Sequence, residues 1–199
     1  MSNVFFINLK GEKKVMNKDY VVTAKPKITG GAFSAPLGTE LPTDAKTELA
    51  KEYVNLGYIG EDGTTNSISE STKDVKSWGG ILVNTTVTEF TDTKKLIFIE
   101  SVNPVVLKEV YGQDNVTGTS LKEGLKVIVS GGTRTYRTYV FDMITGNYLR
   151  RIIYPEAIIT SVGDIVYKTE DSVGYECTIK ARADSAGNTH YEYICEKGE

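Results

Sequence analysis

Apolar and polar residues alternate with a period of two along much of the chain, which is typical of β-strands with one buried face. The alternation is clearest over residues 81–91, and an apolar run over 95–100 predicts a second strand just after it. Further strand-like runs lie at 4–9, 20–23, 53–59, 125–129, 134–143, 147–154, 157–168, 174–183 and 189–195. Gly, Asn and Pro residues separate the later runs, so we expect antiparallel hairpins in a mostly β fold, a sandwich or a barrel.

One segment is predicted to be a short helix beside these strands. Asn103 suits the N-cap position and Pro104 the first helical position, where its missing N–H leaves nothing unpaired. An apolar stripe follows, and Gly112 is a typical stop. Residues 26–47, by contrast, are rich in Pro, Gly and Thr and predict turns or an extended arm.

The polar stretch 61–77 has few apolar side chains that could hold it against a core. We expect a long hairpin excursion or a mobile loop there, because long loops in compact domains are usually functional or disordered. The stretch closes at Trp78, Gly79 and Gly80, and Trp78 is the only tryptophan. Two interpretations stay open: Trp78 anchors a loose loop to the core, or the stretch is an arm that buries Trp78 against another subunit.

Composition and charge exclude several classes of protein. The 199 residues carry 26 acidic and 23 basic side chains, for a net charge of −3, and Lys and Arg form no cluster larger than a pair. This argues against a nucleic-acid-binding protein. No apolar run approaches the roughly 20 residues of a membrane span, and the N-terminus does not resemble a signal peptide. We therefore expect one domain over residues 1–199, in a reducing compartment.

The chemistry-bearing residues point to no catalytic or metal site. Cys177, His190 and Cys195 are the obvious metal ligands, but their spacing fits no known zinc motif, so free thiols are expected. His190 follows a Gly187-Asn188 turn and is expected to be an exposed turn residue rather than a base. Nucleophile and phosphate-loop motifs are absent. The sequence thus favours a structural or assembly protein without cofactors over an enzyme.

Eight stretches of the chain form an ordered set that covers most of it from about residue 24. They are APLGTELPTDA at 35–45, NLGYIGEDGTTN at 55–66, KDVKSWGG at 73–80, NPVVLKEV at 103–110 with Gly112, YVFDM at 139–143, YPEA at 154–157 with VGD at 162–164, GYECT at 174–178, and residues 184–189. In order and spacing this set resembles the major tail protein, or tail tube protein, of long-tailed siphophages of Gram-positive bacteria. Residues 1–23 match less clearly.

The resemblance implies a fold and an assembly. The fold is a β-sandwich or barrel of antiparallel strands with one short flanking helix and a long loop. Six subunits form a ring around a channel, and rings stack into a tail tube around the tape-measure protein, through which viral DNA is ejected. Further partners are the distal tail and tail terminator proteins. DNA passes without specific binding, no membrane is involved, and the protein resides in the virion tail after assembly in the host cytoplasm.

The resemblance also implies where subunits touch. An N-terminal arm (about 1–23) and an inter-subunit loop (about 61–80) extend from the single domain, and the loop reaches a neighbouring ring. The residues expected at that interface are Glu61, Asp62, Gly63, Thr64, Asn66, Lys73, Trp78, Gly79 and Gly80. The residues that line the channel are not indicated.

Three alternatives remain at this stage. The chain could be the tube of a contractile tail or of a secretion or injection system, which has the same fold but different partners. It could be a tail terminator or decoration protein, which forms one ring or coats the outside. The 12 tyrosines also leave room for an enzyme or a carbohydrate-binding β-sandwich.

Overall fold

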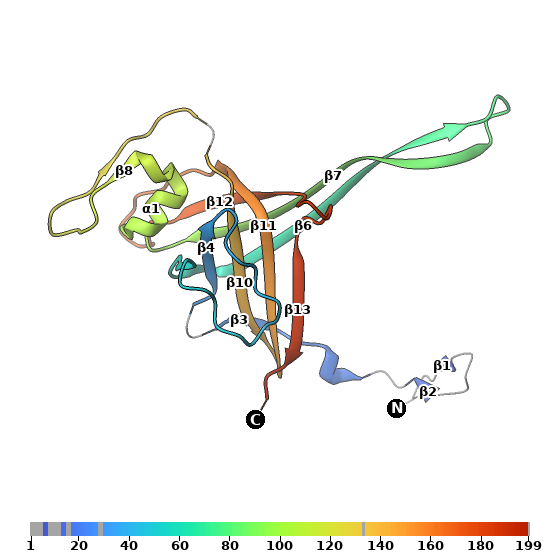
Figure 1. The fold of residues 1–199 in the computed structure, drawn as a ribbon, viewed down its shortest axis with the longest axis horizontal. Coiled ribbons are helices and arrows are strands. Elements are labelled where there is room, and N and C mark those ends of the chain that lie inside the picture. The colour runs from blue at the N-terminus through green and yellow to red at the C-terminus, as the bar shows by residue number, and fades with distance from the viewer. Residues whose placement is uncertain (1–5, 8–12, 15–16, 28–29, 133, 199) are drawn as a thin grey trace.

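The fold is built on one large antiparallel sheet (Figure 1). The computed structural model describes residues 6–7, 13–14, 17–27, 30–132 and 134–198. The strands of the large sheet are β3 (Ala24–Pro26), β4 (Ala32–Pro36), β5 (Val54–Asn55), β6 (Ile59–Lys76), β7 (Leu82–Phe98), β10 (Arg137–Thr145), β11 (Tyr148–Val162), β12 (Tyr175–Arg182) and β13 (Tyr191–Glu196). Two minor ribbons pair β1 (Phe6–Ile7) with β2 (Lys13–Lys14), and β8 (Val116–Thr117) with β9 (Lys126–Val127). The prediction of a mostly β, antiparallel fold is confirmed.

Strand β11 is the centre of the sheet, whose order is β5-β4-β10-β11-β12-β7-β6. Its first half pairs with β13 and its second half with β12. We predicted two strands here, broken at Pro155, and this prediction is wrong. The ladder to β10 shifts register between Arg137 and Tyr139, opposite Pro155, and the Thr138 hydroxyl donates to the Pro155 carbonyl (2.9 Å). A bulge is where a strand tolerates proline, which has no N–H for the ladder.

The polar stretch 61–77 is a strand rather than a loop. It forms most of β6, which pairs with β7 in a hairpin that runs from the sheet far into solvent (Figure 1). The hairpin alternative is thus the one that the structure shows. The two strands predicted over 81–91 and 95–100 are one continuous strand, β7. The polar residues of β6 are compatible with a strand because water reaches both faces of its outer part.

The predicted helix is confirmed. Helix α1 (Pro104–Tyr111) begins after Asn103, whose Oδ1 accepts a hydrogen bond from the Val105 N–H (2.9 Å). It ends at Gly112, where φ is +104°, a value that residues with a Cβ rarely adopt. Two 3₁₀ turns, η1 (Lys18–Tyr20) and η2 (Gln113–Asn115), are the other helical elements among the described residues.

Other strand predictions differ at their ends or fail. Residues 20–23 form no strand, since η1 ends at Tyr20 and pairing begins at Ala24. The predicted arm 26–47 contains β4, and the predicted strand 53–59 is cut short because Gly57 takes φ +73°. The run 157–168 ends as a strand at Val162. Of the predicted strand 4–9, only residues 6–7 lie within the described part of the chain, and they form β1.

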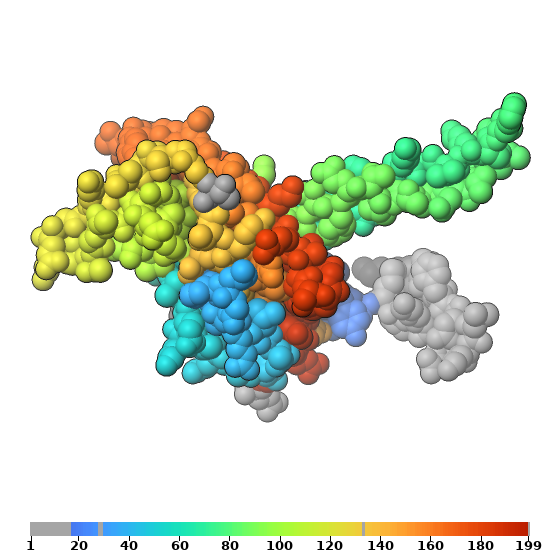
Figure 2. All heavy atoms as spheres, turned by 45° about the horizontal axis from the view of Figure 1, so that its top comes forward, coloured from blue at the N-terminus to red at the C-terminus, as the bar shows by residue number. Residues whose placement is uncertain are grey.

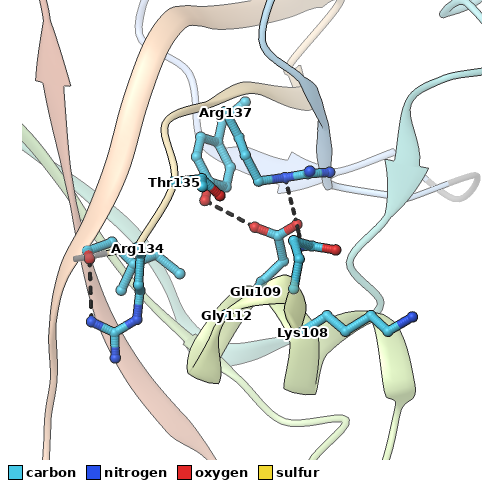
Figure 3. A pocket seen from close by; sticks show the side chains of 9 residues that line it. Lys108, Glu109, Gly112, Arg134, Thr135 and Arg137 are labelled. Atoms are coloured by element: carbon cyan, nitrogen blue, oxygen red, sulfur yellow. Dashed lines mark hydrogen bonds and ion pairs between the residues drawn. The ribbon is translucent and has the colours of Figure 1, made fainter. Parts of the chain in front are cut away.

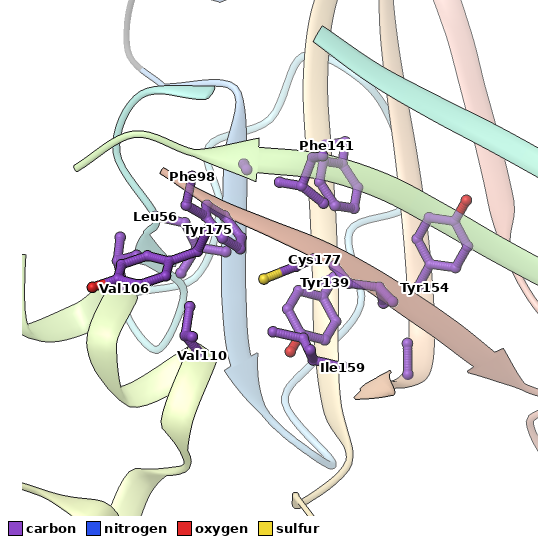
Figure 4. Packing of buried hydrophobic residues seen from close by; sticks show 14 of the residues in the cluster. Leu56, Phe98, Val106, Val110, Tyr139, Phe141, Tyr154, Ile159, Tyr175 and Cys177 are labelled. Atoms are coloured by element: carbon purple, nitrogen blue, oxygen red, sulfur yellow. The ribbon is translucent and has the colours of Figure 1, made fainter. Parts of the chain in front are cut away.

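The main core lies between one face of the sheet and helix α1 (Figure 4). Aromatic and aliphatic side chains from β7, β10, β11 and β12 fill it, and Val106 and Val110 of α1 close it. Cys177 lies within this core and is fully buried. Both Cys177 and the half-buried Cys195 are free thiols, as the sequence predicted.

Burial of Cys177 makes a pH-dependent prediction. Burial raises the pKa of its thiol from 9.0 to about 12, so the folded chain keeps a proton that the unfolded chain releases above pH 9. Folding stability from this group therefore falls as pH rises through that window. The free energy of unfolding of the Cys177→Ala variant, measured relative to that of wild type, should therefore rise by about 3 kcal/mol between pH 7 and pH 11. Urea unfolding of both proteins at each pH measures this, and a pH-independent difference would contradict it.

Candidate assembly surface

The outer part of the β6–β7 hairpin projects from the body with no other described part of the chain against it (Figure 2). Every residue from 65 to 90 is exposed. Several are large and apolar, with exposures of 46% or more: Ile68, Val75, Trp78, Ile81, Leu82, Val83, Val87 and Phe90. Exposed apolar side chains gathered on one element are typical of an interaction site. We call residues 67–90 the projecting hairpin.

A tight turn presents Trp78 at the tip of the projecting hairpin. The Ser77 N–H donates to the Ile81 carbonyl (2.8 Å), and the Gly80 N–H donates to the Ser77 carbonyl (2.9 Å). Gly80 has φ +80°, so a glycine is favoured there by the turn. Trp78 is fully exposed, with a relative accessibility of 107%. In the isolated subunit Trp78 therefore anchors nothing to the core.

A buried polar cluster fixes the root of the hairpin, where β7 leaves the body. The Asp92 carboxylate is buried and accepts a hydrogen bond from the Thr189 hydroxyl (2.7 Å). Its Oδ2 also lies 2.5 Å from Nδ1 of His190, whose ring packs on Tyr154 with centroids 5.3 Å apart. We predicted His190 to be an exposed turn residue, and this is wrong. The turn before β13 folds against β7, which leaves the His190 side chain only 17% exposed.

Lys94 lies beside this cluster with its side chain buried. Its ammonium donates to Oδ1 of Asn66 (2.7 Å) and lies 4.5 Å from the centre of the Phe141 ring. Burial lowers the pKa of Lys94 to about 8, although the nearby Glu192 and Asp92 carboxylates oppose the shift. These contacts tie both strands of the hairpin root to β10, to β11 and to the turn before β13. The sequence did carry a signal for them, since Asp92 and Lys94 occupy the same alternating positions as the apolar Phe90 and Leu96.

The structure divides the expected interface residues into three groups along the hairpin. Glu61, Asp62 and Gly63 form an irregularity at the inner end of β6, between the pairs at Ile59 and Thr64. Thr64 and Asn66 pair with Leu96 and Lys94 at the hairpin root, where Thr64 is half-buried and Asn66 is exposed. The remaining residues lie on the projecting hairpin, namely Lys73, Trp78, Gly79 and Gly80. The structure therefore does not bring the nine residues together in one patch.

One hollow in the described part of the body is nearly filled by a buried polar cluster. Between α1 and β10, the Glu109 carboxylate accepts a hydrogen bond from the Tyr139 hydroxyl (2.9 Å) and pairs with Arg137 (Figure 3). It also accepts one from the Ser34 hydroxyl (2.7 Å). The space left there is about 10 Å³, room for one water. The cluster therefore fastens the helix to the sheet.

A wider groove lies at the inner end of β6, and its lining combines five carboxylates with Lys168 and apolar side chains. It measures about 550 Å³ and includes Glu61, Asp62, Asp164, Asp171 and Glu176. Among the described residues, no group of three or more His, Cys, Asp or Glu side chains is placed to hold a metal ion. Cys177 and His190 occupy separate places, one in the core and one at the hairpin root.

A comparison with protein families decides which class of protein this is. The family model described as phage tail tube protein matches residues 14–198, nearly the whole chain. The chain belongs to the phage tail tube protein family. Membership confirms the resemblance to a tail tube protein and makes the chain a structural component of the virion that self-assembles into a tube.

Two further findings complete the comparison. None of the curated proteins compared with this chain matches it. In the described part of this tail tube protein, no helix has the length and apolar character needed to cross a membrane.

Proposed function

We propose that this tail tube protein forms six-membered rings that stack around a tape-measure protein into the conduit for viral DNA. The family match carries the proposal, because it assigns the tube role to nearly the whole chain. Distal tail and tail terminator proteins are the expected partners at the two ends of the tube. The subunit is expected to have no catalytic activity and no cofactor, and to assemble in the host cytoplasm.

We place an inter-subunit contact on the projecting hairpin. The hairpin is long, paired along its length with two one-residue irregularities, and exposed on both faces. Such a ribbon gains little stability alone, since an isolated two-stranded hairpin is at best marginal in water. Contact with a neighbouring subunit would bury its apolar side chains. Trp78 at the tip suits such a contact, because tryptophan is enriched among residues that dominate interface energies.

The charge of the chain suits a DNA conduit. Six subunits at −3 each carry a formal charge of −18 per ring. A wall with this charge repels phosphates, whereas each Lys or Arg contact to a phosphate would add affinity and slow the passage of DNA. The proposal thus explains why a protein that surrounds DNA has no basic face in its sequence.

Electron microscopy of the purified protein tests the proposal. Concentrated protein, with and without purified tail tips as seeds, should give tubes or stacked rings with a central hole. Single rings that never stack would instead indicate a terminator-like role. Folded monomers that do not assemble at any concentration, even with tips present, would contradict the proposal. A contractile sheath in particles would assign the same tube to a contractile tail.

The Trp78→Ala variant tests the contact at the tip. Because Trp78 touches no core residue, we expect unchanged thermal unfolding of the monomer. The loss of one exposed aromatic anchor should raise the concentration needed for assembly by roughly 30-fold, equivalent to about 2 kcal/mol. Pelleting of polymerised protein over a concentration series measures this. Trp78→Phe is the control and should recover most of the assembly. A destabilised monomer with no separate assembly defect would contradict the assignment.

A further inference from the structure

The face of β7 that lines the core continues past the body onto the projecting hairpin. Going back along β7 from Phe98, every second residue is buried: Phe98, Leu96, Lys94 and Asp92. The next residue in this series is Phe90, which is 46% exposed. The alternating positions that face the core therefore continue along β7 onto the projecting hairpin, where the body no longer covers them. We call this side of the hairpin the core-side face and the other side the outer face.

The pairing register assigns the other hairpin residues to these two faces, because opposed residues of a ladder share a face. Ile68 lies opposite Asp92, Val87 opposite Thr72, and Leu82 opposite Lys76, which places all three apolar residues on the core-side face with Phe90. The outer face carries Ser69, Ser71, Lys73, Val75, Asn84, Thr86, Glu89 and Thr91. Among the residues with a ladder partner, four large apolar residues thus lie on one face and Val75 alone on the other; Ile81 and Val83 have no opposed residue in the ladder.

Two irregularities in β7 maintain this difference between the faces. The ladder shifts register between Ser71 and Thr72, where Thr88 is the extra residue, and again between Val75 and Lys76, where Val83 is extra. A shift of one residue moves the following side chains to the opposite face. The first irregularity therefore brings Val87 onto the core-side face, and the second returns Leu82 to it.

Three of the four exposed apolar residues on this face belong to β7, and Ile68 belongs to β6. The β6 side of the same face carries Glu70, Asp74 and Lys76. The face thus has an apolar stripe with a charged margin, the arrangement expected of an interface with a dry centre and a polar rim. The Asp92 contacts to Thr189 and His190 hold the root of this face in one orientation before any partner binds.

We propose that the core-side face of the hairpin is covered by a second copy of this chain, while the outer face stays in contact with water. The inference rests on the proposed tube assembly and specifies which side of the hairpin makes the contact. A second copy is the occupant because the family assembles with itself. Each copy offers one hairpin and receives one, and such a head-to-tail contact propagates from subunit to subunit. The partner's apolar surface then continues the core of the first subunit.

A matched pair of substitutions tests the choice of face. Val87 and Val75 lie on the same hairpin, on opposite faces, and have similar exposures of 57% and 49%. Val87→Thr and Val75→Thr make the same chemical change, keep a β-branched side chain, and remove no core contact. We expect Val87→Thr to raise the critical concentration of tip-seeded polymerisation roughly fivefold, and Val75→Thr to change it less than about twofold.

A labelling experiment gives a second readout that does not depend on the energy of one methyl group. Cysteine is introduced as Val87→Cys or Val75→Cys in a Cys195→Ser background, where the remaining thiol, Cys177, is buried. In assembled tubes, alkylation at position 87 should slow at least roughly tenfold relative to the monomer, and alkylation at position 75 should not. Circular dichroism confirms that each variant folds.

The outcomes separate this inference from the proposed function. Tubes formed equally well by both threonine variants, with equal labelling at both positions, would overturn the choice of face and leave the tube function intact. Stronger effects at position 75 would do the same. Failure of the wild-type protein to form tubes even with tips would overturn both the function and the inference.

Discussion

A subunit whose hairpin is cut back to the body should fold normally and form no tubes. Ser69 and Thr91 lie directly opposite each other in the ladder, so residues 70–90 can be replaced by a two-residue Asn-Gly turn, the preferred connection for such a hairpin. All the removed residues are exposed, and the anchors at Asp92 and Lys94 remain. The thermal midpoint should therefore change by less than about 3 °C.

The expected loss of assembly is large because the truncation removes every exposed large apolar side chain of the projecting hairpin except Ile68. We expect the critical concentration to rise by more than roughly a hundredfold, since the effects of several interface residues combine. Sedimentation and electron microscopy with tail-tip seeds measure it. The control replaces only Val75 and keeps the hairpin length. Tubes of normal appearance from the truncated subunit would refute the inter-subunit role of the hairpin, and an unfolded subunit would show that the hairpin stabilises the body instead.

Helix α1 illustrates what could be predicted from the sequence alone. Its start depends on Asn103 and Pro104 and its end on Gly112, and all three act through contacts within a few residues. Strand β11 illustrates the limit of such reasoning. Pro155 is an interruption only if a ladder N–H is needed there. The register shift removes this need, because Pro155 and Glu156 of β11 together lie opposite the single residue Thr138 of β10. Local signals therefore predicted the helix, whereas strand ends depended on pairing.

The hairpin was predictable as an excursion but not as a ribbon with two different faces. The polar residues of β6 have no periodic apolar signal, so only the pairing with β7 defines them as a strand. The faces depend on the two irregularities in β7, which shift the alternation at Thr88 and Val83. A strict period of two read along residues 81–91 places Val87 and Phe90 on opposite sides. The register of the structure places them on the same side.

The polar cluster at the hairpin root could not be predicted from the sequence, because its members are far apart in the chain. Asp92 and His190 are separated by 98 residues. They meet because β12 joins β7 to β11, and β13 then returns along the other half of β11. A lone histidine after a turn has no local feature that reveals such a partner, whereas the topology brings it under the hairpin.

A second large effect is expected from the buried ion pair that holds the loop 42–47 to the sheet. The Asp142 carboxylate accepts two hydrogen bonds from Arg151, at 2.6 Å and 2.7 Å, and pairs with Lys27 at 3.1 Å. Arg151 is 2% exposed, and its remaining amino group donates to the carbonyls of Asp44 (3.0 Å) and Thr47 (2.9 Å). The arginine thus joins β11, β10 and the loop in one network.

Asp142→Ala should destabilise the folded subunit by about 3–5 kcal/mol, because it leaves the Arg151 guanidinium buried without its carboxylate. Urea unfolding at pH 7 measures this. Arg151→Met should cost less, since Lys27 still faces the Asp142 carboxylate and the methionine fills the space. The double variant should recover part of the loss, because the only charge that then lacks its carboxylate is Lys27, which is part-exposed (18%). A change of less than about 1 kcal/mol in the free energy of unfolding of Asp142→Ala would contradict this prediction. It would mean that water reaches Arg151 and that the ion pair does not hold the loop on the sheet.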